Sequence, residues 1–336
     1  MQKDVCKGEE IYMCTAVTFT SKDHYFGRTF DWDVSYGEKL VFTPRNFKLE
    51  FRKAGTLENH LAMLGIAVEA GGYPLYYDAI NEAGLGMAGL NFPDNTDYKE
   101  CADDKDNIAS FEFIPWILGQ CKSVNDAKAL LEKIQLVNIS FNEHFQVSPL
   151  HWIIADNEQS ITVECVKEGL RIYDNPVGVL TNNPPFDVQM LWLANYMQLS
   201  NKEPVNFLKD KVMLKPYSRG MGAMGLPGDL SSASRFVKAA FTKLNAVSAE
   251  SEEESVSQFF HIIGSVEQQR GCVMLPNGAY EISVYTSCCN LDKGIYYYKT
   301  YDNSEIWCVD MNREDMESSG LKSYELKRRA RFNCHN

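Results

Sequence analysis

The sequence lacks several features that would assign the chain to a specialised class of protein. No run of 18 or more apolar residues occurs, so we expect no transmembrane helix and no membrane partner. Residues 1–13 contain no apolar stretch of the kind found in secretory signal peptides. Ten cysteines in 336 residues are too few for a disulfide scaffold, and no CxxC pair indicates a zinc site. These absences predict reduced thiols, a cytoplasmic location and no metal.

Positive charge is also scarce. The formal net charge is −12, from 33 Lys and Arg against 45 Asp and Glu. Nucleic-acid binding needs clustered cations, so we expect no nucleic-acid partner. The basic tail at residues 327–331 is the one exception, and a solvated terminus is its simpler interpretation.

What the sequence does contain is a large apolar fraction, 45%, arranged in blocks of strands and helices. Blocks of this kind, rather than strict βαβ alternation, predict an α+β fold with antiparallel sheets and helices packed outside them. Strands are expected at 14–20, 24–32, 39–43, 47–52, 61–69, 74–80, 85–91, 149–155, 160–165, 169–173, 280–287, 294–300 and 305–310. Helices are expected after the capping residue Ser123 and at 187–199, 233–245 and 254–264.

Cys14 directly follows a methionine and heads an alternating strand pattern that runs to Thr20. If the chain starts at Cys14, one residue carries both a thiol and a free α-amine. The amine, with a pKa of roughly 7.7–8.0, can take the proton of the thiol. This pattern predicts amide hydrolysis through a thioester. It also makes residues 1–13 either a propeptide that is removed or a leader ahead of a true start at Met13.

Arg28 and Asp31 lie in the next expected strand, which a turn near residues 21–23 would fold back against the first. That hairpin would bring Arg28 beside Cys14, where its charge would lower the pKa of the thiol. Asp31 would then hold the α-amine. Taken alone, a surface arginine and a turn aspartate explain the same residues.

Asn91, Asn182 and Arg235 complete the candidate constellation. An asparagine amide can donate to an oxyanion without adding charge, although each asparagine alone is also typical of a turn beside a proline. Arg235 opens a helix after the Gly-, Pro- and Ser-rich segment 215–232, where it is either a solvated helix residue or a buried cation near the developing charge.

Together these motifs resemble the choloylglycine hydrolase family, which includes bile salt hydrolases and penicillin V acylases. The resemblance runs from Cys14 to roughly residue 310. The motifs that carry it are Cys14-Thr15, Phe26-Gly27-Arg28, Asp31-Trp32, Ala88-Gly89-Leu90-Asn91-Phe92-Pro93, Leu180-Thr181-Asn182, Pro184, Leu226-Pro227-Gly228-Asp229, Ser232 and Ser234-Arg235-Phe236. Bile salt hydrolases resemble this chain in having asparagine at position 91, where penicillin V acylases typically carry tyrosine.

The resemblance implies a catalytic role for each matching residue. Cys14 would be the nucleophile, with Arg28 and Asp31 as its partners. Asn182 and Asn91 would stabilise the oxyanion together with the Cys14–Thr15 part of the site, and Arg235 would support the transition state. The implied fold is a four-layer αββα sandwich, formed by one catalytic domain over residues 14–336 and commonly assembled as a homotetramer. No cofactor is implied.

The resemblance also implies conjugated bile salts as substrates, cleaved to release glycine or taurine. Family loop positions place Phe30, Trp32, Ala70 and Phe92 in the steroid pocket, although ordinary core packing explains these residues equally well. Tyr217 and Arg219 lie in a loop that resembles the version associated with taurine conjugates, and Arg219 can pair with a sulfonate.

Three other functions fit parts of the sequence. An acylase of the same fold could act on penicillin V or on N-acyl homoserine lactones. A thiol protease would need a Cys–His pair, but no histidine lies in a recognisable signature; those considered are His24, His60, His144, His151 and His261. A catalytically silent protein that binds bile acids would keep the pocket without needing the full set of six polar residues.

Overall fold

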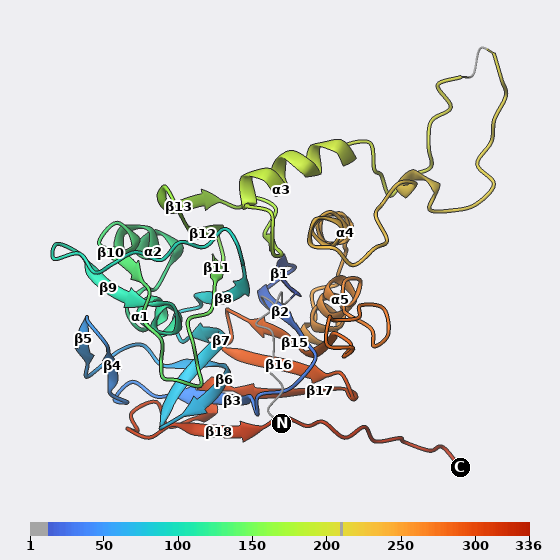
Figure 1. Cartoon of the computed structure of the whole chain (residues 1–336). Helices are drawn as coiled ribbons and strands as arrows, with labels where there is room; N and C mark the ends of the chain where they lie inside the picture. The colour runs from blue at the N-terminus through green and yellow to red at the C-terminus, as the bar shows by residue number, and fades with distance from the viewer. Residues whose placement is uncertain (1–12, 209–210) are drawn as a thin grey trace, which may run out of the picture.

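Two antiparallel sheets lie face to face at the centre of the molecule (Figure 1). The computed structural model describes residues 13–208 and 211–336. The first sheet has the order β14 (Val179–Leu180), β1 (Met13–Thr20), β2 (His24–Trp32), β15 (Ile282–Asn290), β16 (Ile295–Thr300) and β17 (Asn303–Asp310). The second has the order β13 (Gly169–Asp174), β12 (Ser160–Val166), β11 (Leu150–Ala155), β8 (Gly86–Asn91), β7 (Tyr73–Asn81), β6 (Met63–Ala70), β3 (Lys39–Thr43) and β18 (Lys322–Glu325).

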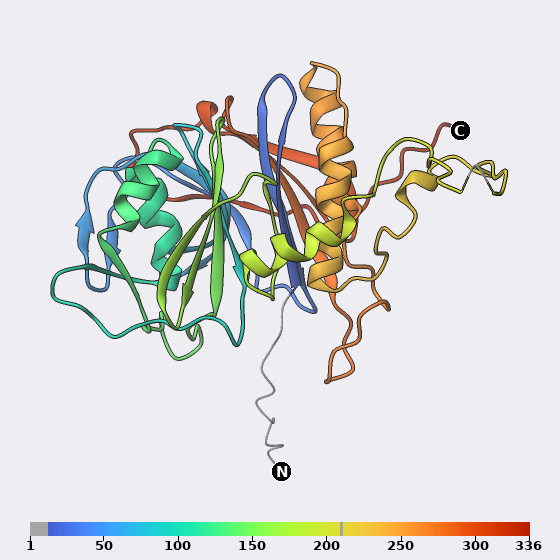
Figure 2. The same ribbon diagram turned by 90° about the horizontal axis from the view of Figure 1, so that it is seen from above.

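Helices cover the outer face of each sheet (Figure 2). On the six-stranded sheet, α4 (Ser232–Asn245) packs on β1, and α5 (Glu252–Gly264) packs on β1, β2 and β15. On the eight-stranded sheet, α1 (Phe113–Gln120) packs on β7 and β8, and α2 (Val124–Leu131) joins the same apolar core. A further helix, α3 (Phe186–Leu193), contacts α4. The predicted α+β fold with an αββα layering is confirmed.

Short elements complete the chain. Two small ribbons pair β4 (Leu49–Phe51) with β5 (Gly55–Leu57), and β9 (Asp106–Ala109) with β10 (Ile134–Val137). Single turns of 3₁₀ helix lie at η1 (Ser110–Glu112), η2 (Ala194–Tyr196), η3 (Met221–Ala223) and η4 (Met311–Arg313).

The hairpin of β1 and β2 places β1 between β2 and the two-residue edge strand β14. Its strands pair in register from Met13 with Asp31 to Thr20 with His24, as the alternating pattern predicts. β15 packs so closely along the other side of β2 that a Cβ at Gly27 would lie 2.1 Å from the Ser287 carbonyl oxygen. Only glycine fits this position. Gly27 therefore allows β2 and β15 to approach closely at the position directly before Arg28.

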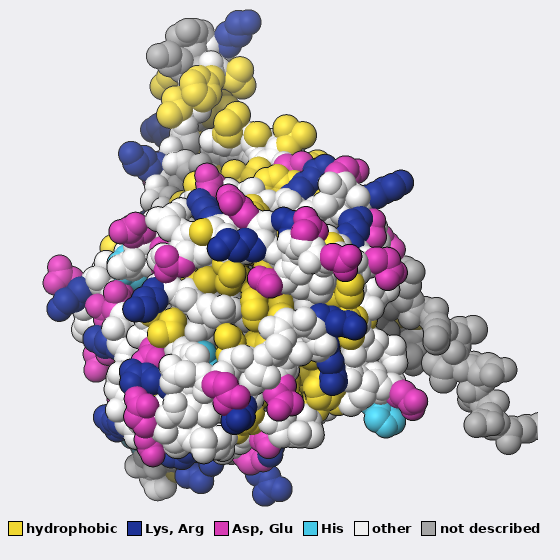
Figure 3. Space-filling model, turned by 90° about the vertical axis from the view of Figure 1, so that its left-hand side faces the viewer, with side chains coloured by type: hydrophobic (Ala, Val, Ile, Leu, Met, Phe, Trp, Pro, Cys, Tyr) yellow, Lys and Arg dark blue, Asp and Glu magenta, His cyan; other side chains and the backbone are white. Residues whose placement is uncertain are grey.

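A long segment between η2 and α4 extends away from the two sheets (Figure 1). We call its described residues, 197–208 and 211–231, the arm. Several large apolar side chains on it are exposed, among them Met197, Phe207, Met213 and Tyr217. Figure 3 shows apolar side chains gathered on this projecting part of the surface.

The predicted leader, residues 1–13, lies outside the described residues except for Met13, which begins β1. None of the helices that the structure describes is long and apolar enough to cross a membrane. Several details differ from the sequence predictions: β5, β9, β10, β14 and β18 were not expected, and the helix expected at 187–199 ends at Leu193. The strand expected at 47–52 is only Leu49–Phe51, and α1 was not predicted at all.

Candidate active site

Cys14 and Arg28 are brought together by the register of the β1–β2 hairpin. Cys14 pairs with Phe30 and Ala16 pairs with Arg28, so the cysteine and the arginine are diagonal neighbours on one face of the sheet. The Arg28 Nη2 donates to the Cys14 Sγ at 2.6 Å. Both side chains are buried. The juxtaposition expected from the sequence is present.

The Arg28 guanidinium is held by backbone carbonyls of both sheets. Its Nη1 donates to Gly89 O at 2.5 Å and to Tyr77 O at 3.2 Å, and its Nε donates to Thr29 O at 3.1 Å. Burial lowers its pKa, but the Cys14 and Tyr285 groups and other nearby acids outweigh that effect and raise it. Arg28 therefore stays charged in the fold.

The thiol of Cys14 responds to two opposed effects. Burial raises its pKa, and the Arg28 charge lowers it. Burial is the larger, so the pKa of the thiol lies above its ordinary value while its nitrogen is part of a peptide bond. The charge of Arg28 acts in the predicted direction without reversing the net shift.

Asp31 lies on the opposite face of β2, as three-residue spacing on a strand requires. Its carboxylate accepts from Thr29 Oγ1 at 2.9 Å and from Ser283 Oγ at 2.5 Å. Burial raises its pKa to about 6, although the Arg235 charge and the two hydroxyls act against that rise. The hydrogen bond of the Cys14 nitrogen goes instead to Asn182 Oδ1, at 2.8 Å.

Asn182 connects the nucleophile strand to two other elements. Its Oδ1 also accepts from Arg235 Nη2 at 2.7 Å, and its Nδ2 donates to Asn91 O at 2.8 Å. Asn91 itself is buried at the end of β8. The two asparagines thus meet, one from the end of β8 and the other from the segment between β14 and α3, and the Asn182 oxygen faces the Cys14 nitrogen.

Arg235 reaches the same point from the first turn of α4. Its Nη1 donates to Cys14 O and to Thr15 Oγ1, both at 2.6 Å, and its Nε donates to Leu230 O at 3.0 Å. Burial lowers its pKa, which the nearby Asp31 carboxylate partly offsets. Arg235 is therefore a buried cation that fixes the backbone of the candidate nucleophile.

Two buried carboxylates near the site were not singled out in the sequence. Glu281 accepts from the Met13 backbone N–H at 2.8 Å, and burial together with the Asp31 charge raises its pKa to about 7. Asp78 accepts from Tyr285 OH at 2.6 Å and from Ser287 Oγ at 3.2 Å, and also from Tyr296 OH. Each lies in an ordinary strand pattern, so no local signal marks it.

Of the residues expected to line a steroid pocket, Phe30 lies on the same face as Cys14, whereas Phe92 packs in the core. Phe30 lies on the Cys14 face of β2 and stacks on Tyr77 with ring centroids 4.5 Å apart. Trp32 is buried, and Ala70 ends β6 in a half-buried position. Phe92 is fully buried and stacks on His151 at 4.2 Å, so in this conformation it packs as core. Beside Tyr77 lies a small aromatic cavity of about 100 Å³, lined partly by Phe111, Phe141 and Phe145.

Tyr217 and Arg219 lie on the arm, exposed, and the arm extends away from the sheets that hold Cys14 (Figures 1 and 2). The structure of one chain does not bring them to the site.

A larger polar cavity of about 420 Å³ lies at the turn end of the β1–β2 hairpin, lined partly by Thr20 and Lys243. Thr18, the lining residue nearest to Cys14 along β1, is four positions away, roughly 13 Å, so this cavity is not part of the cysteine site.

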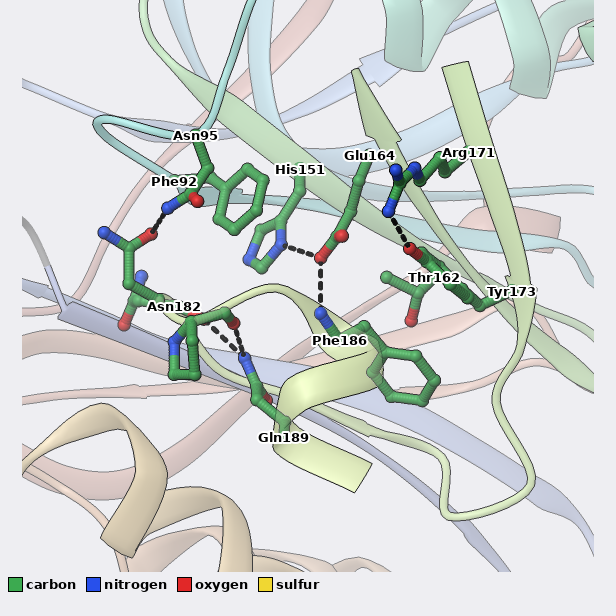
Figure 4. A network of polar contacts seen from close by, with 12 residues as sticks. Phe92, Asn95, His151, Thr162, Glu164, Arg171, Tyr173, Asn182, Phe186 and Gln189 are labelled. Atoms are coloured by element: carbon green, nitrogen blue, oxygen red, sulfur yellow. Dashed lines mark hydrogen bonds and ion pairs between the residues drawn. The ribbon is translucent and has the colours of Figure 1, made fainter. Parts of the chain in front are cut away.

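His151 does not pair with the cysteine. Its ring nitrogens bond to Glu164 and to the Thr181 carbonyl (Figure 4). A Cys–His pair therefore receives no support at this position. Among the residues that the structure describes, no group of three or more His, Cys, Asp or Glu side chains is arranged to hold a metal ion.

Two stacked antiparallel sheets, flanked by helices and with a cysteine near the start of β1, match the N-terminal-nucleophile hydrolase fold. The family model for linear amide C–N hydrolases of the choloylglycine hydrolase family matches residues 14–324. The chain belongs to this family, and it is a hydrolase of linear amides.

Known proteins of this family cover nearly the whole chain. A bile salt hydrolase/transferase of Lactiplantibacillus plantarum is 56% identical over 95% of this chain and 99% of its own. A conjugated bile acid hydrolase of Lactobacillus acidophilus is 37% identical over 93% of this chain and 100% of its own.

Solved structures agree with the fold. A mutant of the conjugated bile acid hydrolase of Clostridium perfringens superposes with a TM-score of 0.89 at 36% identity, over 96% of this chain and 100% of that one. The penicillin V acylase of Agrobacterium tumefaciens has a TM-score of 0.74 at 20% identity, over 93% of this chain and 91% of that one. The second likeness shows the shared fold alone.

Proposed function

We propose that the protein is a bile salt hydrolase, which cleaves the amide bond of glycine- or taurine-conjugated bile acids. The observation that carries the proposal is the buried Cys14, bonded to Arg28 and joined to Asn182 and Arg235, in a chain 56% identical to a bile salt hydrolase/transferase. Asparagine at position 91 favours bile salts over penicillin V as the substrate.

The proposed catalytic domain begins at Cys14, after removal of the residues before it or translation from Met13. The Cys14 nitrogen then becomes an α-amine beside Asn182 Oδ1, which already accepts its hydrogen bond at 2.8 Å. Asp31 supplies a carboxylate for the resulting α-ammonium. A positive charge at this nitrogen would also lower the pKa of the thiol, adding to the effect of Arg28.

The proposed chemistry has two halves. The Cys14 thiolate attacks the amide carbonyl, an S–C bond forms, and the α-ammonium gives its proton to the leaving glycine or taurine nitrogen as the C–N bond breaks. Water then attacks the thioester, losing its proton to the same amine, and the bile acid leaves from sulfur. Asn182, Asn91 and nearby backbone N–H groups stabilise the oxyanion, and Arg235 supports the developing charge.

A preference for taurine conjugates would depend on assembly, because Arg219 lies on the arm. Arg219 can pair with a taurine sulfonate, but in a single chain it lies on an exposed segment that extends away from Cys14. We therefore place its contribution in a homotetramer, in which the arm of one chain reaches the site of another. Exposed apolar side chains on the arm fit an intersubunit role.

The test is the release of glycine from glycocholate and of taurine from taurocholate, with penicillin V as the comparison substrate. We expect bile-salt turnover by the wild type, and a loss of at least about 1,000-fold in Cys14→Ser with unchanged folding. Bile-acid binding that persists in this variant would show that only the chemistry was removed. Faster turnover of penicillin V than of either bile salt would refute the substrate assignment.

A further inference from the structure

His151 and Glu164 form a fully buried pair directly behind the candidate site. They are register partners on the adjacent strands β11 and β12, so strand pairing itself brings their side chains together. The His151 Nδ1 lies 3.0 Å from Glu164 Oε1, and both side chains are 0% exposed. Figure 4 shows the two side chains pointing toward the segment that leads into α3.

The hydrogen-bond partners of His151 determine how many protons the pair holds. Its Nε2 lies 2.8 Å from Thr181 O, and a carbonyl oxygen only accepts, so Nε2 carries a hydrogen. Its Nδ1 faces a carboxylate oxygen, and that contact also requires a hydrogen between the two atoms. The pair therefore holds one proton more than a neutral histidine beside a carboxylate, and its net charge is zero. An unneutralised carboxylate at this depth would be strongly disfavoured.

Among the residues that the structure describes, no lysine or arginine side chain bonds to Glu164. Arg171 is the register partner of Glu164 on β13, but its guanidinium bonds to Glu168 and to Tyr173 OH and lies near Asp187. Among the described residues, Glu164 Oε1 contacts only His151 and the Phe186 backbone N–H, and Glu164 Oε2 has no hydrogen-bond partner.

The pair holds both ends of one short segment, residues 181–186. At its start, Thr181 O accepts from His151. At its end, the Phe186 N–H donates to Glu164 Oε1 at 3.0 Å. That N–H belongs to the first turn of α3, where helix amides lack intrahelical partners and favour a negative charge.

The segment held in this way carries Asn182. Gln189 reinforces it from α3, accepting from Thr181 Oγ1 at 3.1 Å and donating to Pro184 O at 2.7 Å (Figure 4). The position of Asn182 in turn fixes its contacts with the Cys14 nitrogen and with Arg235. A shift of the segment would therefore move the acceptor of the nucleophile's own nitrogen.

We propose that His151 and Glu164 are positioning residues for catalysis, a buried hydrogen-bonded pair that fixes residues 181–186 and, through Asn182, the nitrogen of Cys14. This inference rests on the proposed function of the cysteine site. Neither residue touches the reacting atoms; their effect is on the geometry of the groups that do.

Glu164→Gln tests the proposal with the smallest change in side-chain shape. Without the carboxylate, a neutral His151 keeps its hydrogen on Nε2 and offers an acceptor at Nδ1, whereas the Phe186 N–H needs an acceptor, so one atom of the glutamine amide cannot serve both. We expect kcat for glycocholate to fall by about 10- to 100-fold, with KM changed by less than about threefold, because orientation rather than binding is lost. Ser160→Ala is the matched control: it removes a buried hydrogen bond from the same strand, to Asn175 O, without touching the segment.

A second pair of variants separates positioning from a loss of folding. His151→Gln retains an N–H that can donate to Thr181 O. It leaves the buried Glu164 carboxylate without the group that neutralises its charge, so we expect poor folding or low activity. The double variant H151Q/E164Q keeps one neutral contact to each end of the segment. It should fold and exceed the kcat of H151Q by at least about tenfold. A kcat within about twofold of wild type in folded Glu164→Gln, or a double variant no better than H151Q, would overturn the proposal.

A crystal structure of Glu164→Gln gives a readout that does not depend on the substrate. We expect the distance from Cys14 N to Asn182 Oδ1 to lengthen from 2.8 Å to beyond hydrogen-bond range. An unchanged distance would overturn the positioning role. If the wild type fails to cleave bile salts, the proposed function fails, and this distance still decides whether the pair positions Asn182.

Discussion

Replacing Asp31 by asparagine should stabilise the fold at neutral pH while it impairs catalysis. Burial raises the pKa of this carboxyl from 3.8 to about 6 even though Arg235 and two hydroxyl donors favour its charged form. The folded protein therefore holds the proton of Asp31 more tightly than the unfolded chain does. The contribution of this group to stability is complete below pH 3.8 and is lost as the pH rises through about 6.

The size of the effect follows from the two pKa values. Their difference corresponds to about 3 kcal/mol. An asparagine has the shape of the protonated carboxyl, and the Thr29 and Ser283 hydroxyls can each donate or accept, so both hydrogen bonds can be kept. We expect Asp31→Asn to match the wild type near pH 4 and to be more stable by about 3 kcal/mol above pH 7.

Urea denaturation between pH 4 and pH 8 measures this difference directly. The expected value applies to protein whose intact mass shows that Met13 is still attached. In protein that begins at Cys14, the α-ammonium favours the Asp31 carboxylate, so the gain should shrink. Asp103→Asn, at an exposed position, is the control for the effect of an Asp-to-Asn substitution as such. A stability difference that does not vary with pH in either form would refute the reasoning.

Three further substitutions probe the site. Arg28→Met removes the donor 2.6 Å from the Cys14 sulfur, so the pKa of the thiol should rise further and the rate of Cys14 alkylation should reach its plateau at higher pH; an unchanged profile would contradict the contact. Asn182→Ala should lower kcat about 100- to 1,000-fold in steady-state assays, and a loss below tenfold would exclude the proposed oxyanion role. Arg219→Gly should lower the taurocholate-to-glycocholate rate ratio, and an unchanged ratio would end the taurine proposal. Mixed assembly of Arg219→Gly with Cys14→Ser chains should restore taurocholate turnover if the arm acts between subunits.

The parts of the fold that the sequence predicts are those set by local patterns. Alternation alone places β2 at 24–32 and β3 at 39–43, and both are confirmed to the residue. The hairpin then follows from a short turn between two strands, which is why the contact of Arg28 with Cys14 can be expected from the sequence alone.

Other elements escaped because they give no such local pattern. α1 is apolar on nearly all sides and has no side-chain cap, so it shows neither helical periodicity nor a capping signal. The strand β14, with only two residues, is defined by its pairing with β1 rather than by its own composition.

The supporting residues of the site were hidden for a related reason. His151, Glu164 and Thr181 are brought together by strand register and by a loop 30 residues away from the histidine. Glu281 meets Met13 across 268 residues. Sequence motifs identify the residues that touch the reacting atoms. The residues that hold those groups in place are brought together by strand pairing and loop packing, which a single sequence does not reveal.

The most direct test of the central claim is the intact mass of the enzyme quenched with acid during turnover of glycocholate. The account predicts a chain that begins at Cys14 and carries one cholyl group, which peptide mapping places on Cys14 as a thioester. An acyl group on any other residue, or on a chain that still carries Met13, would contradict the mechanism.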